Sequence, residues 1–196
     1  MIAVKKTTAK THKHTVMRFN QTELTAGFTT INHDMLIEAE ALGCGIKWDV
    51  KNQPVLTSHS LAEGFSPINL KIPCPADGRI MQVISDISAV SKNHPERDPF
   101  TTITGPFSLA YQLIGHDFFN QININPKYIE NVLAYSSAVG EAMATMYIKA
   151  GCTGFSILDP LAGQLESALF EKFVTPFVQP LIDYIHDQSC FCSMNY

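Results

Sequence analysis

The chain has 196 residues, the size of one ordinary domain or of a piece of a larger one. Hydrophobic residues make up 45% and charged residues only 16%, which excludes disorder of the chain as a whole. There are 14 Lys and Arg against 18 Asp and Glu, and the formal net charge of −4 argues against a general nucleic-acid binder. The small charged fraction indicates apolar surface that meets a partner or a missing part of the same fold.

No targeting or membrane segment is predicted. Residues 1–20 lack the apolar stretch of a secretory signal, and the longest apolar candidate, 132–150, is interrupted by polar and charged side chains. The five cysteines are odd in number and irregularly spaced, which does not fit a disulfide framework. We therefore expect a cytoplasmic protein with reduced thiols, no membrane contact and no nucleic-acid partner.

Strands and helices are expected to alternate along the chain. After a polar segment at 1–26, β-branched and aromatic runs predict strands at 27–32, 100–104 and 154–158, with short extended pieces at 46–66. Helical spacing predicts helices at 35–42, 76–90, 108–115, from Asn125-Pro126 for about 25 residues, and at 169–186 with interruptions at Pro176 and Pro180. Helical crossovers between strands indicate a parallel sheet. Residues 189–196 are predicted to be a tail.

Three strand ends stand out, because sites in parallel α/β folds lie at the carboxyl ends of the strands. Asp34 follows the first predicted strand, Gly105-Pro106-Phe107 the second, and Asp159 the third. An acid after an apolar strand is costly unless it is paired or used. The alternatives are structural, with Asp34 as a helix cap and Asp159 as part of a turn. Glu38 and Glu40, on the short helix, are expected at the surface or at the edge of the packing.

Close to the end of the sequence, His186, Cys190 and Cys192 are spaced closely enough to suggest a zinc site. The simpler interpretation is that this segment is a tail, and we assign no metal ligand. The chain contains no Gly-x-Gly-x-x-Gly, no P-loop and no Gly-x-Ser-x-Gly motif. Nucleotide binding and serine-hydrolase chemistry therefore have no support.

Three segments, in order, resemble the uroporphyrinogen decarboxylase superfamily. Asp34 to Gly43 is similar to the family's Asp-Ile-Leu-x-x-Pro-x-Ala-Met-Gly stretch, and Thr104 to Ala110 is similar to its Gly-x-Pro-Phe-Thr-Leu-Ala segment. The third segment, Lys149 to Gly163 followed by Phe170 to Phe177, resembles its Ala-Gly-Ala-Asp-x-(apolar)-Asp-x-x-Ala-Gly motif and the helix after it. The resemblance covers roughly residues 25–188.

Within that superfamily, Glu38 to Gly43 and Gly105-Pro106-Phe107 are most like the methylcobamide:coenzyme M methyltransferase branch. Those relatives take a methyl group from a corrinoid on a partner protein and pass it to a small thiol, which zinc holds as thiolate. The resemblance implies Asp34 as a catalytic residue, and Gly105, Pro106, Phe107 and Asp159 as substrate-binding residues. It implies zinc and a corrinoid protein for an intact member, but no His-x-Cys zinc motif occurs in 189–196, so we assign this chain no cofactor of its own.

Tetrapyrrole decarboxylation, in porphyrin and haem biosynthesis, is the alternative that the wider family implies. There an aspartate, matched by Asp34, hydrogen-bonds the pyrrole N–H groups, whereas the family's active-site Tyr is matched by Gln112.

The resemblance also implies a (β/α)8 TIM barrel, which needs about 250 residues. We therefore expect residues 27–188 to form a partial barrel, about half of one, in a truncated member or in a half completed by a second chain. Whether this chain alone is an enzyme stays open, because an inactive fragment that acts only as a binding module fits the same residues.

Overall fold

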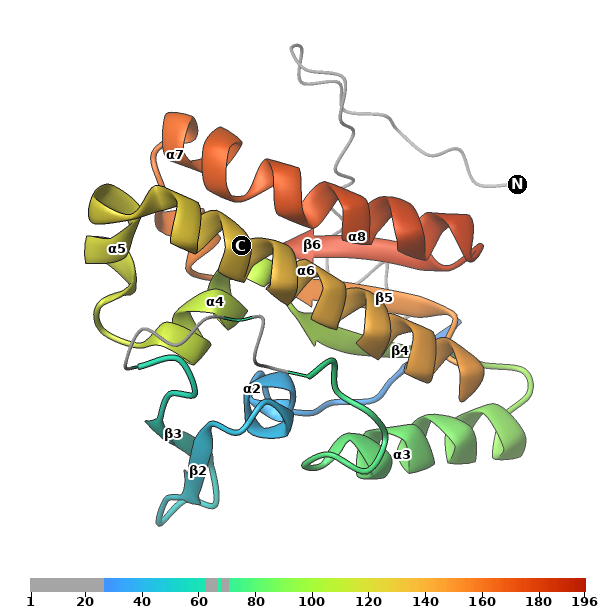
Figure 1. Ribbon diagram of the computed structural model, residues 1–196. Helices are drawn as coiled ribbons and strands as arrows, with labels where there is room; N and C mark the ends of the chain where they lie inside the picture. The colour runs from blue at the N-terminus through green and yellow to red at the C-terminus, as the bar shows by residue number, and fades with distance from the viewer. Residues whose placement is uncertain (1–26, 63–66, 68–70) are drawn as a thin grey trace.

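The computed structural model describes residues 27–62, 67 and 71–196, so the predicted polar segment 1–26 lies outside the described residues. Its main sheet has four parallel strands in the order β1-β4-β5-β6. These strands are β1 (Phe28–Thr30), β4 (Asp98–Thr104), β5 (Gly154–Leu158) and β6 (Phe191–Asn195). A separate antiparallel hairpin of β2 (Gly45–Trp48) and β3 (Pro54–Ser58) lies to one side of the sheet (Figure 1).

Helices connect the parallel strands, as the alternating pattern predicts. They are α2 (Ile37–Ala41), α3 (Ile80–Asn93), α4 (Pro106–Ile114), α5 (Phe118–Ile124), α6 (Pro126–Lys149), α7 (Ser167–Phe173) and α8 (Thr175–Asp187), with a 3-10 turn η2 (Ala162–Gln164). No helix of the described residues is long and apolar enough to cross a membrane.

The ends of the long helix α6 follow from its sequence. Asn125 accepts a hydrogen bond from the backbone N–H of Tyr128 at 3.3 Å, and Pro126 occupies the first turn, where its missing N–H costs nothing. Gly151 follows the helix with φ 104°, a backbone conformation that favours glycine. The observed 24 residues agree with the predicted length of about 25. The predicted helix at 169–186 is divided at Val174 into α7 and α8.

The two faces of the main sheet differ. Ile103, Phe155 and Ile157 are almost completely buried in the core that the helices share, and Figure 1 shows α6 lying along the strands between α8 and α3. Residues on the opposite face alternate with these, as side chains in strands do. There the rings of Phe28 and Phe191 lie 5.8 Å apart, although β1 and β6 are the two edges of the sheet.

That aromatic contact shows how strongly the sheet curves. Phe100, between the edges, lies 5.4 Å from Phe28 and 6.1 Å from Phe191, and a Cβ at Gly154 would collide with the Phe100 ring. Rings from opposite edges can meet only if the face that carries them is concave. The parallel strands, helical crossovers and concave inner face are those of half a (β/α)8 barrel, which confirms the predicted fold class.

The predicted tail at 189–196 is wrong. Residues Phe191–Asn195 form β6, which pairs in parallel with β5 from Gly154↔Phe191 to Leu158↔Asn195. The sequence signal was weak because Phe-Cys-Ser-Met-Asn alternates apolar and small polar residues over only five positions. The part of the half barrel that the structure describes therefore contains four parallel strands and not three.

Hydrogen exchange can test this strand. The N–H of Phe191 bonds to the Thr153 carbonyl, so the N–H groups of Ser193 and Asn195 face β5 in the same way. We expect amide exchange at these three positions to be at least about tenfold slower than in an unstructured peptide, measured by NMR. Exchange at the unprotected rate throughout 190–196 would restore the interpretation as a tail.

Candidate functional site

The predicted site residues lie at the carboxyl ends of the strands, in two groups on either side of β4. Asp159, which follows β5, contacts the segment Gly105-Pro106-Phe107, which follows β4. Asp34, which follows β1, contacts Arg79 at the start of α3 instead. The structure thus brings four of the five predicted residues together and places Asp34 in a neighbouring ion-pair cluster.

Asp159 caps helix α4. Its Oδ2 accepts a hydrogen bond from Phe107 N–H at 3.1 Å, and its Oδ1 accepts from Ser108 N–H at 2.8 Å and Ser108 Oγ–H at 2.7 Å. These are N–H groups of the first helical turn, which have no partner within the helix. A Cβ at Gly105 would collide with the Asp159 side chain, so glycine is required for this close approach. Asp159, which follows β5, therefore has its hydrogen-bond partners in the first turn of α4, which follows β4.

Burial governs the chemistry of this group. Asp159 is fully buried, and desolvation raises the pKa of its carboxyl above the ordinary value, although hydrogen bonds from Ser108 and Phe107 oppose the rise. Pro106 is buried and Phe107 is completely so, with its ring 5.0 Å from that of Phe118. Within the described residues, then, these groups form a packed wall, and their predicted role in substrate binding stays a prediction.

Asp34 is held by an arginine. Arg79 Nη1 donates to Asp34 Oδ2 at 2.5 Å and Nη2 donates to Oδ1 at 3.1 Å, while Arg79 Nε donates to Glu40 Oε2 at 2.5 Å. Arg79 also lies over the indole ring of Trp48, 5.1 Å from its centroid. The side chains of Asp34, Arg79 and Glu40 are 25%, 20% and 28% exposed, so solvent still reaches the cluster.

This pairing keeps Asp34 ionised. Burial alone would raise the pKa of Asp34, but the hydrogen bonds and positive charge of Arg79, with a hydrogen bond from Leu36 N–H at 2.9 Å, lower it below the ordinary value. The stabilisation from a lowered carboxyl pKa is present at neutral pH and is lost as the pH falls through the folded-state value. Asp34 is therefore an anionic hydrogen-bond acceptor at neutral pH, with a weak affinity for protons.

Glu38 is a site residue that the sequence interpretation missed. Its side chain was expected at the surface or the packing edge, but Glu38 is 1% exposed. Its Oε1 accepts from the backbone N–H of Thr104 at 3.0 Å, and its Oε2 accepts from Thr104 Oγ1 at 2.7 Å. Gly105 N–H, one residue on, bonds to Leu158 of β5, so the Thr104 N–H faces the β1 side, where β1 has already ended. Glu38 therefore replaces the missing strand partner.

Further polar groups surround this contact. Thr104 Oγ1 lies 3.1 Å from the Met35 carbonyl, which also accepts from Gln112 Nε2 at 3.0 Å. Among the described residues, no hydrogen-bond partner is found for the buried Gln112 Oε1 or for the buried Tyr147 hydroxyl. The carboxyl end of β4 thus carries a buried polar cluster whose hydrogen bonding is incomplete. A signal was present in the sequence, because Glu38 lies between Ile37 and Ala39 in a helix too short to have a polar face.

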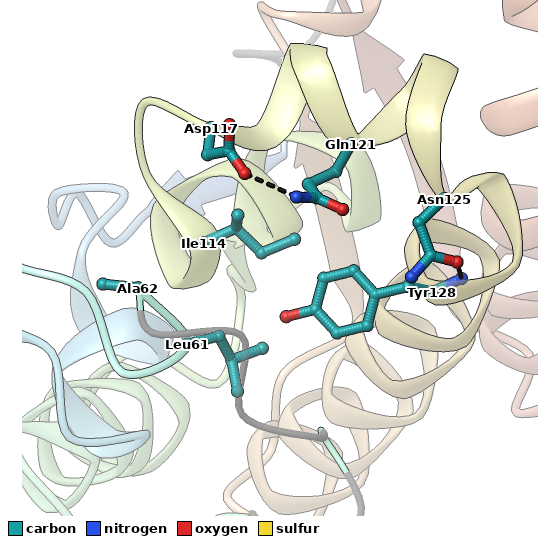
Figure 2. A pocket seen from close by; sticks show the side chains of 7 residues that line it. All are labelled: Leu61, Ala62, Ile114, Asp117, Gln121, Asn125 and Tyr128. Atoms are coloured by element: carbon teal, nitrogen blue, oxygen red, sulfur yellow. Dashed lines mark hydrogen bonds between the residues drawn. The ribbon is translucent and has the colours of Figure 1, made fainter.

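A small pocket lies elsewhere. Figure 2 shows it between the loop at Leu61 and Ala62, the end of α4, and the helices α5 and α6, with the Tyr128 ring along one wall. Its volume is about 100 Å³, and an Asp117–Gln121 hydrogen bond of 2.5 Å lies on its rim. None of the predicted site residues lines it, so this pocket does not extend the site at the strand ends.

A zinc site does not fit the residues described. No group of three or more His, Cys, Asp or Glu side chains among them is arranged to hold a metal ion. Burial raises the pKa of Cys190 and raises that of Cys192 to about 12, so both side chains are thiols at neutral pH in the metal-free chain. Cys190 Sγ is directed to backbone carbonyls, 3.8 Å from that of Cys152 and 3.7 Å from that of Gln188.

Comparisons with known proteins support the sequence resemblance. A family model described as Uroporphyrinogen decarboxylase (URO-D) matches residues 13–194. Among solved structures, a methyltransferase from Methanosarcina mazei matches with a TM-score of 0.77 and 21% sequence identity. The match covers 87% of this chain and 52% of the other, so this chain spans about half the length of that structure. A comparison with curated proteins finds no match.

The cap by Asp159 can be tested with Asp159→Asn. The amide oxygen can accept from only one of the two N–H groups, that of Phe107 or that of Ser108. The NH2 group then faces the other N–H, which loses its acceptor. We expect a loss of about 1–3 kcal/mol in the free energy of unfolding, measured by urea denaturation. The matched control is Asp183→Asn, because Asp183 is exposed and accepts a hydrogen bond from Gln179 on the same helix. This substitution should change the free energy of unfolding by less than about 0.5 kcal/mol. Equal stability of the two variants would contradict the cap.

Thiol labelling can test the assignment of no metal ligand. Cys74 is exposed, whereas burial raises the pKa of Cys44 and raises those of Cys152 and Cys192 to about 12. At pH 7.5 we expect Cys74 to react with iodoacetamide at least about tenfold faster than these three, because the thiolate is the reactive form. Peptide mass spectrometry gives the rates, and Cys74→Ser should remove the fast phase. Rapid labelling of Cys190 and Cys192 that zinc suppresses would show that a site had been missed.

Proposed function

Because the chain belongs to the uroporphyrinogen decarboxylase family, we propose that it carries part of a corrinoid-dependent methyltransferase. The methyl group would come from a methylcobamide held by a partner protein and would pass to a small thiol of the coenzyme M type. The observation that carries this proposal is the likeness of the half barrel to half of a methyltransferase structure, together with the methyltransferase-like segments at Asp34–Gly43 and Gly105–Phe107. The activity and the partners of a whole protein of this kind are part of the proposal.

Asp34 is the residue best placed to act. Its Oδ2 accepts a hydrogen bond from Arg79 Nη1, and a carboxylate oxygen can accept two. Its side chain is 25% exposed, so a thiol at the strand ends could donate its S–H to this oxygen. Arg79 would keep the carboxylate ionised and fixed in orientation. A hydrogen bond of this kind would increase the electron density on the sulfur that attacks the methyl carbon. The thiol proton would pass to solvent, and the electron pair of the broken cobalt–carbon bond would stay with the corrinoid of the partner protein.

The Gly105–Phe107 segment and Asp159 would act through position. They form the packed wall at the carboxyl ends of β4 and β5, where Asp159 caps α4 and fixes the backbone. In the family's methyltransferases zinc supplies the thiolate, but the described residues do not fit that ion. We therefore derive no step through zinc for this chain.

A second candidate function is a binding module for a corrinoid protein without catalysis. The observation in its favour is that the four predicted substrate-binding residues are buried, and that Asp34 is already paired with Arg79. This candidate predicts association with the corrinoid protein but no transfer of the methyl group.

The substitution Asp34→Asn separates these candidates. We expect a full-length protein that contains this half barrel to transfer methyl from methylcobalamin to coenzyme M. Asp34→Asn in that protein should lower kcat/KM at least about tenfold, or 1.4 kcal/mol of transition-state stabilisation. The absorbance change on demethylation of the cobalamin reports the rate. The amide loses the charge that directs the S–H but keeps the size of the side chain.

Asp86→Asn is the matched control, because Asp86 is exposed on α3. Circular dichroism of both variants would exclude a loss of fold, since Asp34→Asn also weakens the contact with Arg79. An unchanged rate for Asp34→Asn would exclude Asp34 as a catalytic residue. No transfer by the unmodified chain, with retained binding to a corrinoid protein, would favour the binding module.

A further inference from the structure

Trp48 brings the hairpin of β2 and β3 into contact with the ion-pair cluster that holds Asp34. The Cζ atom of Arg79 lies over the indole ring of Trp48, 5.1 Å from its centroid. Strand β2, which ends at Trp48, pairs with β3 in a two-stranded sheet that is separate from the four parallel strands (Figure 1). The aromatic ring therefore reaches the cluster from an element outside the main sheet.

Packing in the hydrophobic core does not account for the position of Trp48. The residue is 52% exposed and lies outside the buried core that the described residues form. A half-exposed indole gains little free energy from burial, but the face of its ring attracts a cation such as a guanidinium. We therefore explain the position of this ring by its contact with Arg79.

The backbone before Arg79 is already fixed by helix α2. A Cβ at Gly78 would lie 3.2 Å from the backbone nitrogen of Ala41 and 3.3 Å from Cγ of Glu40, and Gly78 has a φ of 51°, which favours glycine. The first atoms of the Arg79 side chain therefore start from a fixed point. Only its far end, the guanidinium, requires a further restraint.

The hydrogen bonds of the guanidinium are a weak restraint by themselves. Arg79 donates to Asp34 and Glu40, but all three side chains are between 20% and 28% exposed. Ion pairs that solvent reaches are weak, partly because a long side chain loses conformational freedom when it is fixed. The hydrogen bonds act within the plane of the guanidinium, whereas the Trp48 ring attracts it from one side. The ring thus reduces the freedom that the ion pairs would otherwise have to restrict.

We propose that Trp48 is a positioning residue for Asp34 and that it acts through Arg79. The ring holds the guanidinium where Nη1 and Nη2 meet the two oxygens of the carboxylate, and this keeps Asp34 Oδ2 in one orientation. Trp48 itself does not contact the reacting atoms. Its role in catalysis rests on the proposed function of Asp34, whereas its coupling to Asp34 is measured on this chain without turnover.

The substitution Trp48→Ala tests this coupling. Without the ring, Arg79 stabilises the charged form of Asp34 less, so the pKa of Asp34 should rise. We expect its acid dissociation constant to fall at least about twofold. The 13C chemical shift of the Asp34 carboxyl carbon, followed by NMR as the pH is lowered, gives this constant. Trp48→Phe keeps an aromatic face and should restore at least about half of the difference.

Val55→Ala is the matched control, because Val55 is an exposed apolar residue of β3 in the same hairpin. This substitution truncates an apolar side chain of the hairpin but leaves the Trp48 ring in place, so it should not change the pKa of Asp34. An equal rise in the two alanine variants, or no rise in Trp48→Ala, would overturn the proposal. Either result would leave the proposed methyl transfer as it stands.

Fluorescence of the unmodified chain provides a second measurement, in case Trp48→Ala does not fold. Coupling between two sites is reciprocal, so the ionisation of Asp34 must affect the ring if the ring affects Asp34. Because the sequence contains one tryptophan, we expect its emission to change with the same midpoint as the Asp34 carboxyl signal. Asp34→Asn should abolish this transition. Emission that stays constant through the midpoint, or a transition that persists in Asp34→Asn, would contradict the coupling.

The role in catalysis has its own readout in a full-length protein. There Trp48→Ala should lower kcat for methyl transfer at least about twofold, and Trp48→Phe should restore it. A lower rate without a change in the pKa of Asp34 would overturn the proposal. If Trp48→Ala shifts that pKa but Asp34→Asn leaves the rate unchanged, the proposed function of Asp34 fails and the coupling itself is confirmed.

Discussion

The carboxyl end of β4 is the part of this structure on which the candidate site depends. It is held from both sides by buried carboxylates. Glu38 binds the backbone and hydroxyl of Thr104 where β1 has ended, and Asp159 binds Phe107 and Ser108 at the start of α4. Burying an acid costs free energy unless its oxygens accept hydrogen bonds, and the oxygens of both acids accept them from the same short segment. The path of the chain from Thr104 to Ser108 is thereby determined by its two neighbours in the sheet.

This arrangement divides the acids of the site by function. Asp159 and Glu38 are fully buried and are used to position backbone, whereas Asp34 keeps partial exposure and a charge that Arg79 stabilises. An acid with its pKa lowered is a weak general base but a lasting negative charge. Any chemistry at Asp34 therefore depends on hydrogen bonding or on electrostatic attraction. The partly exposed Arg79–Asp34 pair is also the element that a charged ligand could compete with.

The sequence predicted most of the fold and less of the site, for physical reasons that differ. The bounds of strand β5 and helix α6 were predicted accurately because their signals are local. These signals are a short β-rich run for β5, and an Asn cap followed by Pro and a terminal Gly for α6. Strand β6 was missed because its five residues gain their stability from β5 and carry little pattern of their own. Asp34 and Asp159 were found from their place after strands, but their partners Arg79 and Ser108 are 45 and 51 residues distant in sequence. Glu38 was missed because its partner Thr104 lies 66 residues away in sequence and only the fold brings the two together.

The inner face of the half barrel differs in character between its amino and carboxyl ends. Barrel interiors of this fold are usually filled by bulky branched side chains. Here the aromatic rings at the amino end meet across the sheet, from Phe28 to Phe191, and close the floor from one half alone. The next row has hydroxyl side chains, Thr102, Ser156 and Ser193, which are much smaller than those rings. The hydrogen-bonding groups of this inner face therefore lie between the aromatic rings at the amino end and the strand ends that Asp34 and Asp159 follow.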